Sequence, residues 1–258
     1  MNQALLIDLD GVLRIGIKPA PYLEEFLMFL SDSKIKACIL SNSSLYSSEK
    51  VKKFFAEHSI QINLPIITTV DTALNYVKRN YKNVAVYTTE EVKELFSQFL
   101  NYSTPEAVLI GDIGKQWSYE IMQRIFIFLK NGAKLIAMHK NKFWNKPDEG
   151  LQLDAGTFIK GLEFAADVKA KLLGKPSKIY FQAALKLLDL KSTEKFFMLG
   201  DDLDTDITGA KNIGAETILI YTGKTKKPIP MQYNKVVDYE AENLKDVISI
   251  LKDNIKVI

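Results

Sequence analysis

Short apolar segments alternate with longer amphipathic segments along the chain. The apolar segments predict β-strands at Ala4–Ile7, Ala37–Leu40, Val84–Tyr87, Ala107–Ile110, Lys134–Met138, Phe196–Leu199, Thr217–Tyr221 and Val236–Val237. Several of them are apolar at every position, which is typical of parallel strands covered on both faces. Between them, apolar residues at helical spacing predict helices at Pro21–Ser31, Leu45–Glu57, Val70–Arg79, Ser118–Lys130, Pro176–Leu188 and Thr205–Ile213. This alternation predicts an α/β fold with a largely parallel sheet.

The length and charge narrow the class of protein. A chain of 258 residues forms one large domain or two modest ones. A net charge of +3 is too weak to indicate binding to nucleic acid or to an anionic membrane. Arg14, Arg79 and Arg124 are the only arginines, so phosphate recognition would depend mostly on lysine, hydroxyl and backbone N–H groups.

Cysteine content and hydropathy predict the compartment. Cys38 is the only cysteine and lies in an apolar segment, so we expect a buried thiol and no disulfide framework. The N-terminal segment becomes charged too early for a signal peptide, and no apolar stretch approaches the ~20 residues of a membrane span. We therefore expect a cytoplasmic protein that does not associate with membranes.

Acidic residues follow two of the predicted strands. Asp8 and Asp10 follow the first strand, and because side chains alternate along a strand, both point to the same side. Gly11 then permits a turn. A second group follows the strand at 196–199 and consists of Asp201, Asp202, Asp204 and Asp206. Ligands of open α/β sheets bind at the carboxyl ends of the strands, so we expect the two acidic groups to meet there.

The second acidic group favours magnesium over calcium. Asp202, Asp204 and Asp206 have the first spacing of an EF-hand loop, but Ile207 replaces its glycine and Ile213 its final glutamate. The Asp-x-Asp-Gly segment alone is also compatible with a polar strand end. Two acidic strand ends together are costly unless a cation is bound, and Mg²⁺ fits because it takes a few protein oxygens and leaves its other positions to water and phosphate.

Two further segments carry groups suited to phosphate. Ser41 and Asn42 follow the strand at 37–40, where their side chains either contact phosphate oxygens or cap the next helix. Lys175 precedes a helix start, where its ammonium and the helix dipole can act on one anion; a surface role is the alternative.

Taken in order, the Asp-x-Asp-Gly segment, the serine after the second strand, the lysine and the acidic Gly-Asp stretch resemble the four motifs of the haloacid dehalogenase-like superfamily. The long insertion between Ser41 and Lys175 resembles subfamily IIA, in which an α/β cap of the C2 type is inserted there. The resemblance implies a Rossmann-like parallel-sheet core at residues 1–80 and 172–258, with the cap domain at 81–171. Cap segments at 112–119 and 150–154 are similar to the branch acting on phospholysine, phosphohistidine and pyrophosphate.

The resemblance also implies roles for single residues. Asp8 would be the nucleophile that forms an aspartyl-phosphate, and Asp10 would be the general acid and base. Mg²⁺ would be held by Asp8, by the backbone carbonyl of Asp10 and by Asp201. The phosphoryl oxygens would contact Ser41, Asn42 and Lys175. Asp206 and Asp202 would orient this shell, although Asp202 and Asp204 could equally be solvated.

The substrate is expected to be a small phosphorylated molecule, with pyrophosphate or a phosphoramidate preferred to a sugar phosphate or nucleotide. His139, Asp154 and Thr157 are the cap candidates for substrate contact, whereas His58 is expected at the surface. Similar proteins commonly form dimers through the cap, so the resemblance allows a homodimer. A receiver-type switch domain is disfavoured because such domains are about half as long. A phosphate-binding protein without turnover is disfavoured because all the motif residues are present.

Overall fold

The computed structural model describes residues 4–146, 149–190 and 194–254 and divides the chain into two units. The first unit contains Met1–Ser41, Glu49–Ile67 and Lys175–Ile258, and the second contains Asn42–Ser48 and Thr68–Gly174. Each unit has its own sheet and its own buried apolar clusters. An α/β core with an inserted α/β unit is the fold expected from the sequence. Among the described residues, no helix is both long enough and apolar enough to cross a membrane.

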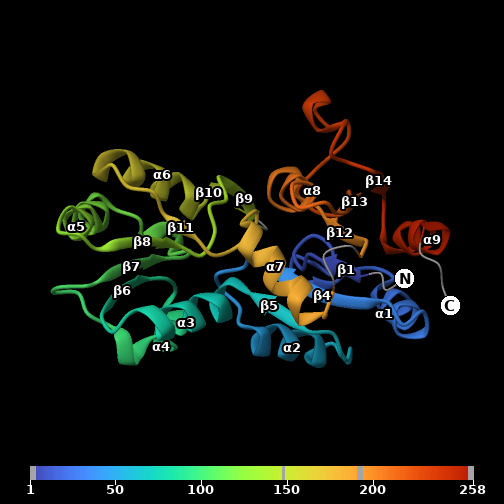
Figure 1. Ribbon diagram of the computed structural model, residues 1–258, viewed down its shortest axis with the longest axis horizontal. Coiled ribbons are helices and arrows are strands. Elements are labelled where there is room, and N and C mark those ends of the chain that lie inside the picture. The colour runs from blue at the N-terminus through green and yellow to red at the C-terminus, as the bar shows by residue number, and fades with distance from the viewer. Residues whose placement is uncertain (1–3, 147–148, 191–193, 255–258) are drawn as a thin grey trace. The chain divides into compact units, whose positions relative to one another are not determined.

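A six-stranded sheet forms the centre of the first unit (Figure 1). Its strand order is β14 (Tyr239–Ala241), β13 (Glu216–Ile220), β12 (Phe196–Gly200), β1 (Ala4–Ile7), β4 (Lys36–Ser41) and β5 (Ile66–Thr68). The pairs from β14 to β4 are parallel. A small hairpin, β2 (Arg14–Ile15) and β3 (Lys18–Pro19), follows β1.

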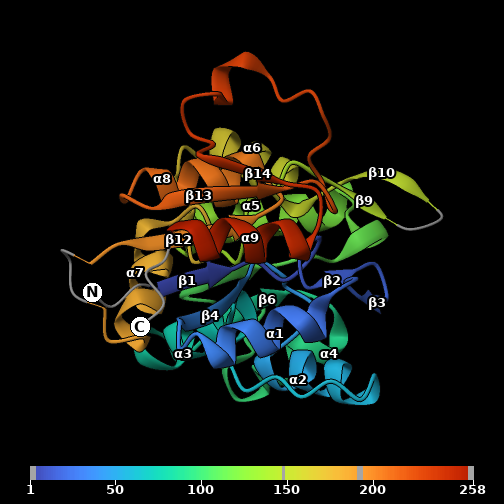
Figure 2. The same cartoon turned by 90° about the vertical axis from the view of Figure 1, so that its right-hand side faces the viewer.

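Helices cover both faces of this sheet, which explains the continuously apolar strands. Alternate residues of β1 and β4, such as Leu6 and Cys38, pack against Tyr180 and Phe181 of α7 (Lys178–Leu187) and Ala210 of α8 (Gly209–Lys211). Figure 2 shows α1 (Leu23–Asp32) and α9 (Leu244–Asn254) side by side over the other face. The chain also forms helix α2 (Ser48–Glu57).

The second unit has a parallel four-stranded sheet. Its order is β11 (Lys171–Leu172), β8 (Lys134–Ala137), β7 (Ala107–Ile110) and β6 (Val84–Tyr87). One face packs on α3 (Thr69–Asn80) and α4 (Glu90–Glu94), and the other on α5 (Tyr119–Lys130) and α6 (Ala155–Ala166). An antiparallel hairpin, β9 (Phe143–Lys146) and β10 (Gly150–Leu153), precedes α6.

The main segment of the second unit begins at Thr68, whereas the resemblance implied a cap domain from residue 81. The cause is α3: Val70, Ala73 and Val77 are fully buried in the same cluster as Val84 and other residues of β6. Because its apolar side chains have their partners on the second sheet, α3 belongs to this unit.

Other expectations from the sequence need correction. Val236–Val237 is not a strand; the edge strand is β14, whose Tyr239 pairs with Ile218. The expected helix at 205–213 is a π-helical turn at Leu203–Thr208 followed by the short α8. Helix α6, which the sequence analysis did not predict, begins directly after β10, because the carboxylate of Asp154 accepts the Ala155 N–H at 2.7 Å and caps that helix.

Candidate functional site

The strand register brings the motif residues to one edge of the first sheet. Ile7, the last residue of β1, pairs with Leu199 of β12 and with Ile39 of β4, and these two strands end shortly afterwards, at Gly200 and Ser41. The N–H of Asp8 continues the ladder by donating to the Leu199 carbonyl at 2.9 Å. Asp8, Asp201 and Ser41 therefore lie at the carboxyl ends of adjacent strands, where α/β folds bind ligands.

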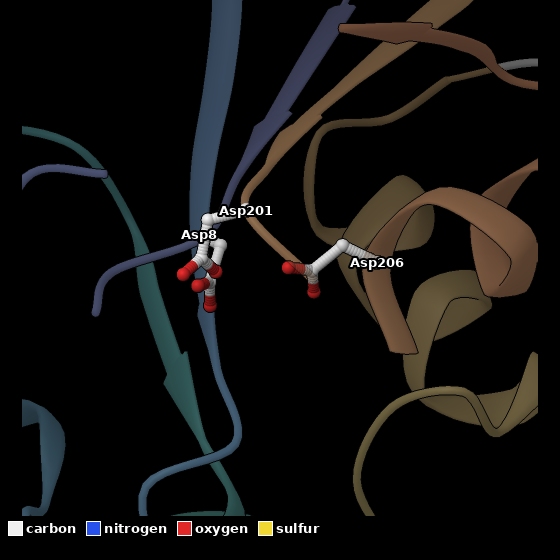
Figure 3. A group of neighbouring side chains, drawn as sticks. All are labelled: Asp8, Asp201 and Asp206. Atoms are coloured by element: carbon white, nitrogen blue, oxygen red, sulfur yellow. The ribbon is translucent and has the colours of Figure 1, made fainter. Parts of the chain in front are cut away.

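Three buried carboxylates meet at this edge (Figure 3). Asp8 follows β1, Asp201 follows β12, and Asp206 reaches toward them from the helical turn after β12. Each of these residues contributes one carboxylate oxygen, and the three oxygens lie within 4.8 Å of one another. The Lys175 Nζ forms ion pairs with the Asp8 Oδ1 and, at 2.7 Å, with the Asp206 Oδ1. The site therefore holds three acids against one ammonium group.

This excess of buried acids raises their pKa values. Burial, followed by repulsion from Asp206, raises the pKa of Asp8 well above its ordinary value. The same two causes raise the pKa of Asp201 to about 7, and burial raises that of Asp206. Burial disfavours the charge on Lys175, but Asp206 and Asp8 outweigh it and raise the lysine pKa. The cluster therefore has negative charge that only a further cation or protons can neutralise.

Two glycines hold the side chain of Asp201 between them. A Cβ on Gly11 would lie 2.2 Å from the Asp201 Oδ2, and a Cβ on Gly223 would lie 1.9 Å from it. The same oxygen accepts the Lys224 N–H at 2.5 Å, and the Asp201 carbonyl accepts the Thr225 hydroxyl at 2.6 Å. The loop after β13 thus fixes the orientation of this carboxylate.

Asp206 and Asp202 support the cluster in different ways. Gly200 leaves room for Asp206, since a Cβ there would lie 2.4 Å from the Asp206 Cβ. The Oδ1 of Asp202 caps the next turn by accepting backbone N–H groups at 2.8 and 3.0 Å, and its Oδ2 pairs with the Lys224 Nζ at 2.5 Å. Burial opposes the charge of Asp202, but Lys224 and the N–H donors keep its pKa below the ordinary value.

The side chain of Asp10 has a different partner from the three clustered carboxylates. Its side chain is half exposed and its Oδ1 is paired with Arg14, a buried cation on β2. The expected general acid and base is therefore held by a residue to which the sequence analysis gave no role.

The expected phosphate ligands have defined positions. Ser41 ends β4 and is fully buried, and its carbonyl accepts the Tyr180 hydroxyl at 2.6 Å. Asn42 begins the segment that groups with the second unit, where Gly174 leaves space for it: a Cβ on Gly174 would lie 2.5 Å from the Asn42 Oδ1. A phosphate-binding role for Ser41 and Asn42 stays a prediction.

The cap candidates lie in the second unit and differ in exposure. His139 and Asp154 are buried, and the His139 Nε2 lies 3.2 Å from the Ser44 Oγ and 3.8 Å from the Asp154 Oδ1. Ser44 also accepts the Asp112 N–H at 3.0 Å. Thr157 is exposed, and its hydroxyl donates to the Lys142 carbonyl at 2.8 Å. His139 and Asp154 thus have internal partners, while Thr157 remains open to solvent.

The donor set at the sheet edge suits a hard divalent cation. Carboxylate oxygens from two strand ends lie within reach of one ion, and no histidine or cysteine belongs to the group. Oxygen-only ligation is what Mg²⁺ prefers. The uncompensated charge described above is a second observation in favour of a bound cation.

Sequence reasoning missed the loop at 223–225 and Arg14. The loop follows β13, a neighbour of β12 in the sheet, so a Gly-Lys pair at that strand end was the available signal. Arg14 carried a weaker signal, as one of three arginines placed four residues after an acidic motif residue.

Comparisons with known proteins agree with this geometry. The family model described as Haloacid dehalogenase-like hydrolase matches residues 5–99, and a second hydrolase model of the same superfamily matches residues 172–247. The chain is 33% identical over 228 residues to the mouse (Mus musculus) haloacid dehalogenase-like hydrolase domain-containing protein 2, covering 87% of this chain and 86% of the relative. It is 27% identical over 256 residues to the Homo sapiens phospholysine phosphohistidine inorganic pyrophosphate phosphatase, covering 96% and 94%.

A solved structure shows the same fold. The p-nitrophenyl phosphatase from Archaeoglobus fulgidus superposes with a TM-score of 0.82 at 25% identity, covering 97% of this chain and 99% of the other. The similarity therefore includes both the core and the inserted unit. With its four motifs, its inserted α/β unit and these relatives, the chain belongs to the haloacid dehalogenase-like hydrolases, and within them to the phosphatases of subfamily IIA.

Proposed function

We propose that this protein is a magnesium-dependent phosphatase that hydrolyses a small phosphorylated molecule through an aspartyl-phosphate on Asp8. The observation that carries the proposal is the buried group of Asp8, Asp201 and Asp206 around a single Lys175. Such an excess of negative charge is costly in a folded protein, and a bound cation removes that cost.

The carboxylate of Asp8 attacks phosphorus, which splits one displacement into two easier ones. Lys175 is held in place by Asp206 and binds phosphoryl oxygens as negative charge develops on them, together with Ser41 and Asn42. Asp10 protonates the leaving group and later takes a proton from the attacking water, a contribution typically worth ~10²–10⁴-fold in rate.

Bound magnesium would reduce the repulsion between the Asp8 carboxylate and the anionic phosphoryl group. Its protein ligands would be the carboxylates of Asp8 and Asp201 and the backbone carbonyl of Asp10. Asp206 is then a supporting residue, because its Oδ1 pairs with Lys175 and its Oδ2 accepts the Asp202 N–H at 3.2 Å.

For the substrate, pyrophosphate or a phosphoramidate is the first choice. A human relative named phospholysine phosphohistidine inorganic pyrophosphate phosphatase aligns over 96% of this chain. A sugar phosphate or a nucleotide is the second choice, and a screen of phosphorylated metabolites that includes both groups decides between them. A preference of at least about tenfold in kcat/KM, or about 1.4 kcal/mol, for a nucleotide or sugar phosphate would reject the first choice only.

The test of the chemistry is the Asp8→Asn variant. It keeps the shape of the side chain but removes the nucleophile, so we expect phosphate release from 4-nitrophenyl phosphate to fall by more than about 10³-fold. Asp32→Asn is the matched control, because Asp32 is exposed at the end of α1. Phosphate release within tenfold of wild type by Asp8→Asn would refute the proposal.

A further inference from the structure

Arg14 and Asp10 form a two-point ion pair in the loop that follows β1. The guanidinium donates from Nε at 2.8 Å and from Nη2 at 2.5 Å, and both N–H groups point to the same oxygen, Oδ1. Among the described residues, none donates a hydrogen bond to the other oxygen, Oδ2. The pair therefore gives the two oxygens of Asp10 different surroundings.

The loop and a neighbouring ring fix the guanidinium. The Arg14 carbonyl accepts the Gly11 N–H at 2.7 Å, and the Arg14 N–H donates to the Leu9 carbonyl at 3.0 Å. The guanidinium carbon lies 5.2 Å from the centre of the Phe54 ring. The Arg14 side chain is 7% exposed and that of Asp10 is 49% exposed. A buried cation thus holds a carboxylate that reaches solvent.

An arginine has properties here that a lysine lacks. Its planar group donates from two fixed positions and does not lose its proton in proteins. Because two N–H groups face Oδ1, a proton on Asp10 has room only on Oδ2. Arginine is also rare in this chain, at three positions among 34 basic residues, so its use at this position is not a reflection of composition.

We infer that Arg14 is a positioning residue that presents the Oδ2 of Asp10 as the atom that exchanges protons in the reaction. The inference rests on the proposed function. In the first step an Asp8 oxygen bonds to phosphorus, the bond from phosphorus to the leaving oxygen breaks, and the proton on Oδ2 moves to that leaving oxygen. In the second step a water oxygen bonds to phosphorus, the bond to Asp8 breaks, and a proton of the water moves to Oδ2.

The test compares two aryl phosphates that differ in their need for a proton. The leaving group of phenyl phosphate needs protonation, whereas that of 2,4-dinitrophenyl phosphate does not. In rapid-mixing experiments, we expect Arg14→Met to lower the first-turnover rate with phenyl phosphate by about 10- to 100-fold, and that with 2,4-dinitrophenyl phosphate by less than about threefold. KM should stay within about threefold for both substrates, because Arg14 orients Asp10 and is not proposed to bind substrate.

Arg14→Lys keeps the charge but loses the two-point geometry, so its loss with phenyl phosphate should be intermediate. This variant also decides the question if Arg14→Met does not fold, as checked by thermal unfolding. The matched control is Arg79→Met, an exposed arginine on α3 that should leave all rates unchanged.

Equal rate losses with the two substrates, a change in KM alone, or a gain in rate would overturn the inference. The Asp8→Asn experiment separates this outcome from a failure of the proposed function. An inactive Asp8→Asn variant together with equal losses in Arg14→Met rejects only the role of Arg14. An active Asp8→Asn variant rejects the phosphatase mechanism itself.

Discussion

Each unit of the molecule contains a buried polar cluster, and the two clusters differ in charge balance. In the first unit, Asp8, Asp201 and Asp206 surround one lysine. In the second unit, His139 lies near both Ser44 and Asp154, and these two accept nearby backbone N–H groups. Among the described residues, the first cluster has more acids than cations, whereas the polar groups of the second cluster have internal partners. Unbalanced burial indicates a site for a ligand, whereas balanced burial indicates a structural role.

The largest effect on stability is expected from Lys175→Met, which removes the one cation that the described residues place in the first cluster. Removing one partner of a buried ion pair typically costs about 3–5 kcal/mol, so the free energy of unfolding without metal should fall by that amount. Phosphatase activity should fall by about 10²–10³-fold, as when a donor to developing oxyanion charge is lost. Chemical denaturation and phosphate release measure the two effects. Lys178→Met, at an exposed position on α7, is the control and should change neither.

A smaller effect is expected from pH on the metal-free protein. Asp201 has a pKa of about 7 in the folded state, above the ordinary value near 4. Between these values the folded state binds a proton that the unfolded state has released, so stability falls as pH rises from about 4 to about 7 and then levels off. The melting temperature in chelator should therefore be higher at pH 6 than at pH 8. Mg²⁺ favours the ionised acid, so its addition should stabilise the protein more at pH 8.

The Asp201→Asn variant sharpens this measurement. The amide does not titrate, so the difference between pH 6 and pH 8 in chelator should shrink and the response to Mg²⁺ should weaken. If the melting temperature of the wild type in chelator rose from pH 6 to pH 8, the assignment of uncompensated charge to this cluster would be wrong.

The smallest effect is expected from His139→Gln in the second cluster. Loss of the contact with Ser44 should lower the free energy of unfolding by about 1–3 kcal/mol, as for a buried hydrogen-bonding group left without its partner. The substrate ranking should not change, because the partners of His139 are internal. His58→Gln is the control at an exposed position. A changed ranking with unchanged stability would instead support substrate contact by His139.

The sequence predicted the strands best where burial is complete on both faces. Ala4–Ile7, Val84–Tyr87 and Ala107–Ile110 have the expected bounds, because every residue in them is apolar or small. Helix α6 was missed because Gly156 resembles a loop residue. A glycine is needed at 156 because the backbone packs closely there: a Cβ at this position would lie 2.3 Å from the Lys140 carbonyl oxygen. Such a contact depends on tertiary structure and leaves no periodic signal.

In the candidate site, too, some features follow from sequence patterns and others depend on tertiary structure. The grouping of Asp8 and Asp201 could be predicted because parallel strand ends must meet at one edge, whereas Lys175 was placed with them only by the resemblance. The pairing of Asp10 with Arg14 depends on how a loop closes, and the contact of Lys224 with Asp202 depends on a loop more than twenty residues away. Patterns in a sequence identify the acids, but only the folded loops show which partner each acid has.

The two glycines beside Asp201 have a consequence for classifying other members of the family. Activity is usually assigned to a sequence when its acidic motif residues are present. Gly11 and Gly223 leave the space that the side chain of Asp201 occupies. A Cβ at either position would lie within 2.2 Å of the Asp201 carboxylate oxygen. A relative that keeps every acid but has a side chain at either of these positions lacks the room that this carboxylate occupies here. Inspection of these two positions can therefore separate working enzymes from inactive copies that still carry all the motifs.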